Sequence, residues 1–273
     1  MSDIKKMKLY SDAYRIFKDL EALGYSENDE LNLEDLNQFD QLHYHGTLSV
    51  QEAIETINIQ ENDNVLEVGA GWGGPSRYIA YKTGAHVSAL ELQKDYSEVG
   101  QKLTRKTGLE RFVTHINQDF LNFSQKDNYF NKIVSWLALY HIPDRKKYTH
   151  KLFNLLNKNG MLFIEDLTFG EMFESSHEAL LEKKLFANSL EKYSDYLDTC
   201  ANVGFKIIEH KDMSSDWESF TNERLKVLQA NKNNHEKIHG AEGYKTIEDF
   251  YTTVTECFAA NIIGGIRLIC KKI

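Results

Sequence analysis

Four glycines between an apolar strand and a helix are the residues best placed for chemistry in this sequence. Val65 to Val68 is a short, apolar and largely β-branched run that predicts a buried strand, and Gly69, Gly71, Gly73 and Gly74 follow it. Glycine lets a backbone turn sharply and approach a ligand closely, and the helix expected after the loop leaves backbone N–H groups free at its first turn. The stretch therefore predicts a nucleotide-type cofactor loop at the end of a strand.

Two acidic side chains narrow the choice of cofactor. The spacing Gly69-x-Gly71-x-x-Gly74 satisfies the dinucleotide fingerprint. Glu67 precedes the loop, where a carboxylate would repel a pyrophosphate but would suit the cationic α-amino group of a methionine moiety. Glu91 ends the next predicted strand, about 20 residues after the first glycine, where a carboxylate can accept both ribose hydroxyls of NAD or of S-adenosylmethionine. It argues against NADP, whose 2′-phosphate it would repel.

A second candidate for chemistry is the segment Ser135 to Asp144, which contains Leu137 and His141. Ligands of open α/β sheets bind outside the carboxyl ends of the strands, so this segment should face the reacting groups. His141 has an ordinary pKa suited to accepting a proton near neutrality. The alternative is a structural histidine bonded to a backbone carbonyl, and both interpretations stay open here.

The elements that must position these residues alternate between strands and helices, which predicts a parallel sheet with right-handed crossovers. We expect an α/β fold: a Rossmann-like, seven-stranded, mostly parallel sheet with helices on both faces and a helical cap. The expected strands are 65–68, 85–92, 112–119, 132–139, 161–167, 205–210 and 265–271. Residues 61–273 would form this domain, and the long helical stretches at about 172–200 and 215–262 would be cap insertions.

Residues 1–60 precede the sheet and should form an N-terminal helical lid. Aromatic and apolar residues recur at helical spacing from Tyr10 to Leu23, and Gly24 ends the run. The segment Phe39 to Gly46 is dense in aromatic and imidazole groups, including Tyr44, and would line a substrate pocket or pack the N-terminal helices.

The composition indicates which partners, metals and cellular compartments the protein can be expected to have. Hydrophobic residues make up 41% of the 273 residues, enough for a sizeable core, and the formal net charge is −9. The acidic balance gives no general attraction for nucleic acid, and no apolar run is long enough to insert into a membrane. The three cysteines lack metal-ligand spacing, so we expect no metal and reduced thiols. The N-terminus has no signal-peptide core, so we expect a cytoplasmic protein, with an organelle matrix as the alternative.

The motifs together resemble class I S-adenosylmethionine-dependent methyltransferases. The resemblance rests on the loop Glu67 to Gly74, on Glu91, on Asp119-Phe120 and on the segment Ser135 to Asp144. The segments Phe39 to Gly46 and VLEVGAGWGGPSRYIA are more narrowly similar to the small-molecule branch. That branch includes sarcosine/dimethylglycine N-methyltransferases and the phosphoethanolamine and tocopherol methyltransferases. The resemblance covers residues 39–170 well and the cap only by position.

The resemblance implies a role for each matching residue. Asp119 would accept the adenine amino group and Phe120 would pack on the ring, although Asp119 could also be a simple helix N-cap. The residues implied for the cofactor S-adenosylmethionine are Glu67, Gly69, Ala70, Gly71, Glu91, Leu92, Asp119, Phe120 and Leu137. The phosphobase members imply a catalytic pair of a histidine on the fourth-strand segment and a lid tyrosine, which match His141 and Tyr44, with Tyr10 or Tyr14 as alternatives to Tyr44.

The implied activity is methyl transfer to a small-molecule acceptor, and the resemblance favours an amine of the glycine, sarcosine or dimethylglycine type. Leu137 stands where phosphobase members have an aspartate, which puts phosphoethanolamine in doubt. A glycine-type acceptor implies a cationic group, often an arginine, that holds the substrate carboxylate. Arg77 and Arg145 are near the motifs, but the sequence does not place either in a pocket.

Two alternatives from other classes remain at this point. One is a catalytically silent methyltransferase-fold subunit or scaffold that retains the cofactor, and the other, more remote, is an NAD-dependent oxidoreductase. Whether the chain forms a homo-oligomer or joins a larger assembly is left open by the sequence.

Overall fold

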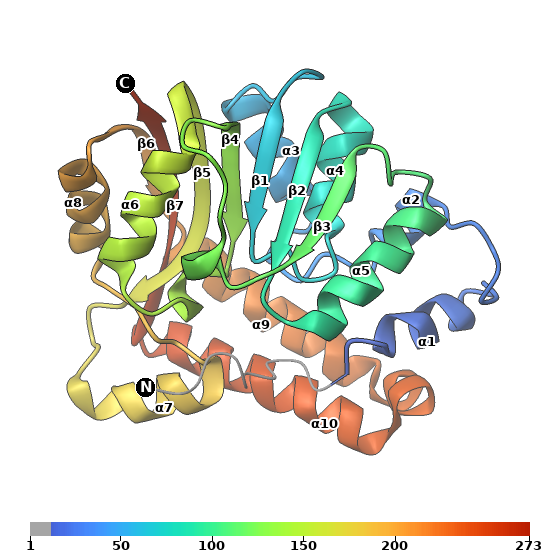
Figure 1. Ribbon diagram of the computed structural model, residues 1–273. Coiled ribbons are helices and arrows are strands. Elements are labelled where there is room, and N and C mark those ends of the chain that lie inside the picture. The colour runs from blue at the N-terminus through green and yellow to red at the C-terminus, as the bar shows by residue number, and fades with distance from the viewer. Residues whose placement is uncertain (1–11) are drawn as a thin grey trace.

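A seven-stranded β-sheet forms the centre of the computed structural model, which describes residues 12–273 (Figure 1). Its order is β3-β2-β1-β4-β5-β7-β6. Strands β1 to β5 are parallel, and β7 runs antiparallel to both β5 and β6. The strands are β1 (Asn64–Val68), β2 (His86–Glu91), β3 (Val113–Asn117), β4 (Phe130–Trp136), β5 (Leu156–Phe169), β6 (Phe205–Asp212) and β7 (Ile263–Lys272). The predicted mostly parallel, Rossmann-like sheet is confirmed.

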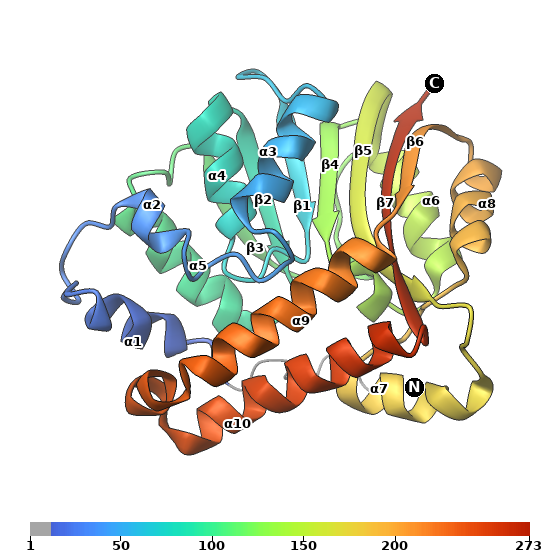
Figure 2. The same cartoon turned by 180° about the vertical axis from the view of Figure 1, so that it is seen from behind.

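Helices cover both faces of the sheet because its strands are apolar on both sides. In β1, Val65 packs in the cluster that contains α3 and α4, and its neighbour Leu66 packs in the opposite cluster with α6 and α8. Successive side chains of a strand point to opposite faces, so this short apolar run supplies both cores (Figures 1 and 2). The helices beside the sheet are α3 (Thr47–Thr56), α4 (Gly74–Thr83), α5 (Lys94–Lys106), α6 (Arg145–Leu155) and α8 (Tyr193–Val203).

A helical cap lies across the carboxyl ends of the central strands (Figures 1 and 2). It consists of α7 (Glu178–Leu185), α9 (Ser214–Ala230) and α10 (Lys232–Ala259), whose buried side chains form one cluster. The stretch 172–200, expected to be the first cap insertion, contributes to two different parts of the structure. Its first half becomes α7 after the short helix η4 (Ser175–His177), whereas Tyr196 and Cys200 of α8 pack in the core of the sheet.

The N-terminal segment is anchored to the sheet by buried polar contacts. It contains α1 (Arg15–Ala22) and α2 (Leu33–Leu36). The indole N–H of Trp72 in the glycine loop donates to the backbone oxygen of Ala13 at 2.9 Å. Asp40 and Arg77, both fully buried, form an ion pair at 2.8 Å. Part of the predicted lid, from residue 12 onward, is thus built into the core, while Tyr10 lies outside the described residues.

The two largest differences from the predicted strand boundaries are at the end of β4 and at the start of β5. Strand β4 ends at Trp136, because Leu137 takes a left-handed φ of 50° and Leu139 enters the short helix η3 (Leu139–His141). Strand β5 begins at Leu156, which pairs with Phe130 across an irregularity in the ladder. Both differences come from backbone geometry that hydrophobic patterning does not encode.

Two expectations from composition can be set beside the structure. Cys200, Cys257 and Cys270 are buried and free of disulfide bonds. Among residues 12–273, no helix combines the length with the apolar composition that crossing a bilayer requires.

Candidate active site

A cavity of about 190 Å³ lies between the carboxyl ends of the central strands and the cap. The order of strands reverses at β1, which is flanked by β2 and β4, and ligands of such sheets bind at that point. All eleven predicted site residues line this one cavity: Tyr44, Glu67, Gly69, Ala70, Gly71, Glu91, Leu92, Asp119, Phe120, Leu137 and His141. Residues that are up to 97 positions apart in the sequence, as Tyr44 and His141 are, thus share one site.

The glycine loop brings strand β1 close to the end of β4. Gly69 has a φ of +79°, and a Cβ added there would lie 2.2 Å from the Cβ of Ala138. Glycine is therefore required at this position by packing within the protein as well as by its conformation. The loop then enters α4, whose first turn contains Pro75 as the sequence predicts.

Glu91 connects the second strand to the glycine loop. Its carboxylate accepts the backbone N–H of Gly71 at 2.8 Å and that of Gln93 at 2.7 Å. Burial raises its pKa. The side chain is held at the end of β2 by these two bonds, at the place where the sequence predicts a ribose-binding carboxylate.

The sequence suggests an ionised carboxylate at Glu67, whereas its surroundings in the structure favour the protonated, uncharged form. It is 2% exposed, it is hydrogen-bonded by the Ser76 hydroxyl, and burial raises its pKa to about 8. The side chain therefore carries a proton at neutral pH. A cationic group placed beside it would favour the ionised form and lower this pKa, so the predicted partnership with an ammonium group would release a proton.

Asp119 is a helix cap and a cavity-lining residue at once. Its carboxylate accepts the backbone N–H of Leu121 and the side-chain amide of Asn122, both at 2.9 Å. These bonds start the short helix η2 (Phe120–Asn122), in which Phe120 is buried. Asp119 is thus an N-cap, as the alternative interpretation proposed. Asp119 and Phe120 also line the cavity, so the adenine-binding role is compatible with the cap and stays a prediction.

The exit of β4 holds an unusual backbone conformation beside the cavity. Leu137 has a φ of 50° and donates its N–H to the backbone oxygen of Glu165 at 2.8 Å. A left-handed conformation is costly for a residue with a branched side chain, and such positions cluster at ligand sites. The turn directs the following residues, up to His141, along the cavity.

His141 is fixed in one orientation. Its Nδ1 lies 3.0 Å from the backbone oxygen of Phe186, and only 7% of the residue is exposed. Burial lowers its pKa to about 4, so the expectation of a group titrating near neutrality is wrong. The neutral ring donates from Nδ1 to the carbonyl, which leaves Nε2 as the proton acceptor. The structural role that we weighed is therefore present, and the catalytic role stays a prediction.

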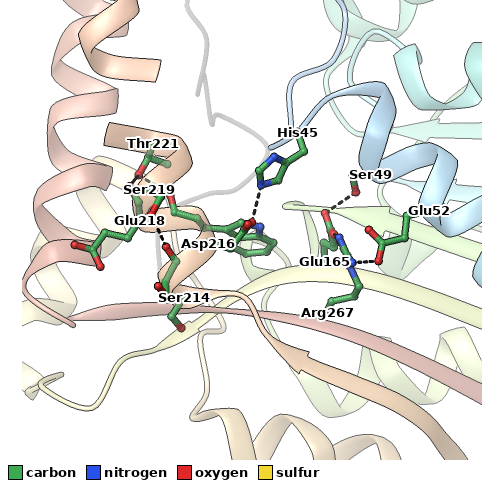
Figure 3. Close-up of polar contacts among 12 residues, drawn as sticks. His45, Ser49, Glu52, Glu165, Ser214, Asp216, Glu218, Ser219, Thr221 and Arg267 are labelled. Carbon is green, nitrogen blue, oxygen red and sulfur yellow. Dashed lines mark hydrogen bonds and ion pairs between the residues drawn. The ribbon is translucent and has the colours of Figure 1, made fainter. Parts of the chain in front are cut away.

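The lid contributes more to the cavity than Tyr44. Tyr44 packs edge-on against Trp217 of α9, with ring centroids 5.1 Å apart. Its neighbour His43 also lines the cavity, with Nε2 3.0 Å from the backbone oxygen of Gly46. Burial lowers the pKa of His43 to about 4. Next to them, His45 Nε2 lies 2.6 Å from a carboxylate oxygen of Asp216 on α9 (Figure 3).

A polar network supports the wall of the cavity from behind. Trp136 lines the cavity and donates from its indole nitrogen to Ser49 Oγ at 2.9 Å. Ser49 donates to Glu165 at 2.8 Å, and Arg267 Nε donates to the same carboxylate at 2.8 Å (Figure 3). Burial raises the pKa of Glu165, whereas the guanidinium of Arg267 acts in the opposite direction.

Several cavity residues could not be chosen from the sequence. They belong to the cap helices α7 and α10, where apolar residues occur on several faces: Leu185, Phe250, Tyr251 and Val254. A helical pattern shows that such residues are buried, but which of them meets a ligand depends on how the helix docks. His43 belongs to the lid segment Phe39 to Gly46, which the sequence predicted either to line a substrate pocket or to pack the N-terminal helices, without a role for its histidines.

Comparison with known proteins places the chain among methyltransferases. A family model described as mycolic acid cyclopropane synthetase matches residues 18–267. The glycine/sarcosine/dimethylglycine N-methyltransferase of Actinopolyspora halophila is 25% identical over 185 residues, or 68% of this chain and 33% of that protein. The phosphoethanolamine N-methyltransferase of Plasmodium falciparum is 26% identical over 209 residues, or 75% of this chain and 76% of that one. The chain thus spans about a third of the first relative.

Solved structures agree on the fold. Phosphoethanolamine N-methyltransferase 2 of Haemonchus contortus, in complex with S-adenosyl-L-methionine, has a TM-score of 0.82 at 15% identity over 98% of this chain and 59% of that one. A cyclopropane synthase of Mycobacterium tuberculosis has a TM-score of 0.74 at 16% identity over 99% and 98% of the two chains.

Proposed function

The chain belongs to the mycolic acid cyclopropane synthetase family of class I S-adenosylmethionine-dependent methyltransferases, and we propose that it transfers a methyl group from this cofactor to a small-molecule amine. One observation carries the proposal. The residues predicted for the cofactor and the residues predicted for catalysis line the same cavity, with the cap opposite them. The other alternative class, an NAD-dependent oxidoreductase, loses its support with this family membership.

The hydrogen-bond acceptors around the cavity fit the cofactor. Glu91 is fixed at the end of β2 for the ribose hydroxyls, and Glu67 lies below the glycine loop for the ammonium group. Asp119 and Phe120 are adjacent at the side of the cavity for the adenine. The cofactor supplies a methyl group activated by a positively charged sulfur. In our proposal the chain supplies alignment and a site from which water is excluded.

His141 would take the proton that the acceptor nitrogen loses. In the proposed reaction the acceptor nitrogen forms a bond to the methyl carbon, the carbon–sulfur bond breaks, and the N–H proton moves to Nε2 of His141. The Phe186 carbonyl holds Nδ1–H and so keeps Nε2 unprotonated. Tyr44, which reaches the same cavity from the lid, would orient the acceptor.

A silent subunit that only retains the cofactor is the alternative that remains. Titration calorimetry with S-adenosylmethionine, followed by a methylation assay on a panel of amines, separates the two. Cofactor binding with turnover supports the proposed function. Cofactor binding with no turnover on any amine favours the silent subunit, and no binding at all contradicts both.

Glu91→Ala is expected to weaken cofactor binding by about 1.5–3 kcal/mol, or roughly 10- to 150-fold in Kd, the scale of lost charge-assisted hydrogen bonds. Calorimetry with S-adenosylhomocysteine measures this directly. The matched control is Glu98→Ala, at an exposed position on α5 where the carboxylate lies 3.6 Å from Lys94 Nζ, and this variant should bind like the unmodified protein. Equal Kd values for the two variants would remove Glu91 from the cofactor site.

A further inference from the structure

Among the described residues, the ionisable side chains that line the cavity are carboxyl groups, phenols and imidazoles. Among the described residues that line it, four have carboxyl side chains and none is a lysine or an arginine. The carboxyl groups belong to Asp40, Glu67, Glu91 and Asp119. The two histidines of the lining, His43 and His141, are neutral at physiological pH because burial lowers the pKa of each to about 4. No described side chain is therefore available to neutralise an anion in the cavity.

The cations closest to the motifs are engaged elsewhere. Arg77 is fully buried, paired with Asp40 at 2.8 Å, and donates to the backbone oxygen of Trp72 at 2.7 Å. Arg145 lies 3.3 Å from Glu191, and its guanidinium is 3.9 Å from the ring centre of Tyr196. Neither arginine lines the cavity. The sequence left these two arginines as candidates for holding a substrate carboxylate, and the structure assigns both to internal ion pairs.

The wall opposite the cofactor residues is apolar and aromatic. It comes from the exit of β4, from β5 and from cap helices α7 and α10, which cross the carboxyl ends of the strands (Figure 2). We call the following six residues the acceptor wall: Tyr140, Leu167, Leu185, Phe250, Tyr251 and Val254. Such a surface favours the uncharged form of an amine, which is also the nucleophilic form.

We propose that the methyl acceptor is an amine on an apolar body that carries no carboxylate or phosphate group. The inference rests on the proposed function and names its substrate class. An anionic group against the acceptor wall would lose its hydration without gaining a cationic side chain among the described residues that line the cavity. The two relatives described above have names that refer to acceptors with a carboxylate or a phosphate. The acceptor of this chain would differ from both in that respect.

Matched pairs of probes test the inference on the full chain. The pairs are N-methylphenethylamine against N-methylphenylalanine, and ethanolamine against phosphoethanolamine. Calorimetry measures binding of each probe to the protein loaded with S-adenosylhomocysteine, and initial rates with S-adenosylmethionine give kcat/KM. We expect the member without the acidic group to be favoured by about tenfold or more in the first pair, the size of one uncompensated charge. N-Methylphenethylamine should also bind more tightly than ethanolamine, because only it fills the apolar wall.

A charge-introducing variant makes the test independent of which amine is the natural one. Tyr251 is half-buried on α10, so Tyr251→Arg can place a cation at the acceptor wall, and Tyr251→Gln is the neutral control. Relative to Tyr251→Gln, Tyr251→Arg should shift the preference toward N-methylphenylalanine by about tenfold.

The outcomes separate the inference from the proposed function. Failure of S-adenosylhomocysteine to bind contradicts the proposed function. If it binds, the inference is overturned when N-methylphenylalanine or phosphoethanolamine matches or exceeds its partner. It is also overturned when neither carboxylate-free amine binds at millimolar concentration, or when Tyr251→Arg and Tyr251→Gln show the same preference.

Discussion

His141→Ala should lower kcat by about 10²–10⁴-fold on a secondary amine, with little change in the Kd of S-adenosylhomocysteine, because the variant removes the proton acceptor and leaves the cofactor residues in place. A secondary amine is required, since a tertiary amine has no proton to lose. Steady-state rates give kcat, and calorimetry gives Kd. His150→Ala, at an exposed position on α6, is the matched control and should retain the full rate.

The pH dependence of this reaction follows from the low pKa of His141. The ring accepts a proton only in its neutral form, and this form is present at every pH above about 4. The contribution of His141 to kcat should therefore be constant between pH 6 and 8 and should fall as the pH decreases through about 4. An inflection near pH 6.5 that disappears in His141→Ala would show that the ring titrates as if exposed. Equal kcat values and superimposable profiles for the two proteins would remove His141 from the mechanism.

Arg77→Met should lower the free energy of unfolding by about 3–5 kcal/mol, the cost of leaving a buried charge without its partner. Asp40 is the residue left behind, since its carboxylate is fully buried and Arg77 is its only cation within 4 Å among the described residues. Urea denaturation followed by tryptophan fluorescence measures the change. Burial already raises the pKa of Asp40, and Arg77 opposes this. In the variant the protonated form of Asp40 is favoured further, so the loss of stability should shrink as the pH falls toward 4.

A double variant separates the charge effect from lost packing. Asp40→Leu combined with Arg77→Met removes both charges and should be less destabilised than the sum of the two single variants. Strict additivity would mean that the ion pair contributes no coupling and that the loss comes from cavity formation alone. Lys94→Met, at an exposed pair with Glu98, is the control for a charge whose removal should cost less than about 1 kcal/mol.

The sheet and the family could be predicted from the sequence because the relevant signals are local. Short apolar strands such as β1 alternate with helices, and the loop from Glu67 to Gly74 carries its own geometry in its glycines. Parallel strands end at one edge, so residues at those ends share a site whatever the details of the packing. This is why ten of the eleven predicted residues line one cavity, which Tyr44 joins from the lid. The family resemblance is also confirmed.

Properties that depend on tertiary packing could not be predicted in this way. The low pKa of His141 and the raised pKa of Glu67 come from burial by segments distant in the sequence. Arg77 is next to the glycine loop, yet its partner Asp40 lies 37 residues away. The acceptor wall depends on how α10 docks, and α8 packs on the sheet although it follows α7 of the cap directly.

The place of β7 in the sheet has a consequence for the order in which the fold can form during synthesis. Strands β1 to β5 pair with one another and emerge in turn, so they can assemble as soon as they are made. Within residues 12–273, strand β6 pairs only with β7, which follows about 50 residues later, after α9 and α10. Until β7 is inserted between β5 and β6, strand β5 offers an unpaired edge to other chains. The nascent chain should therefore be most prone to aggregate, and most in need of chaperones, while the cap helices are being translated.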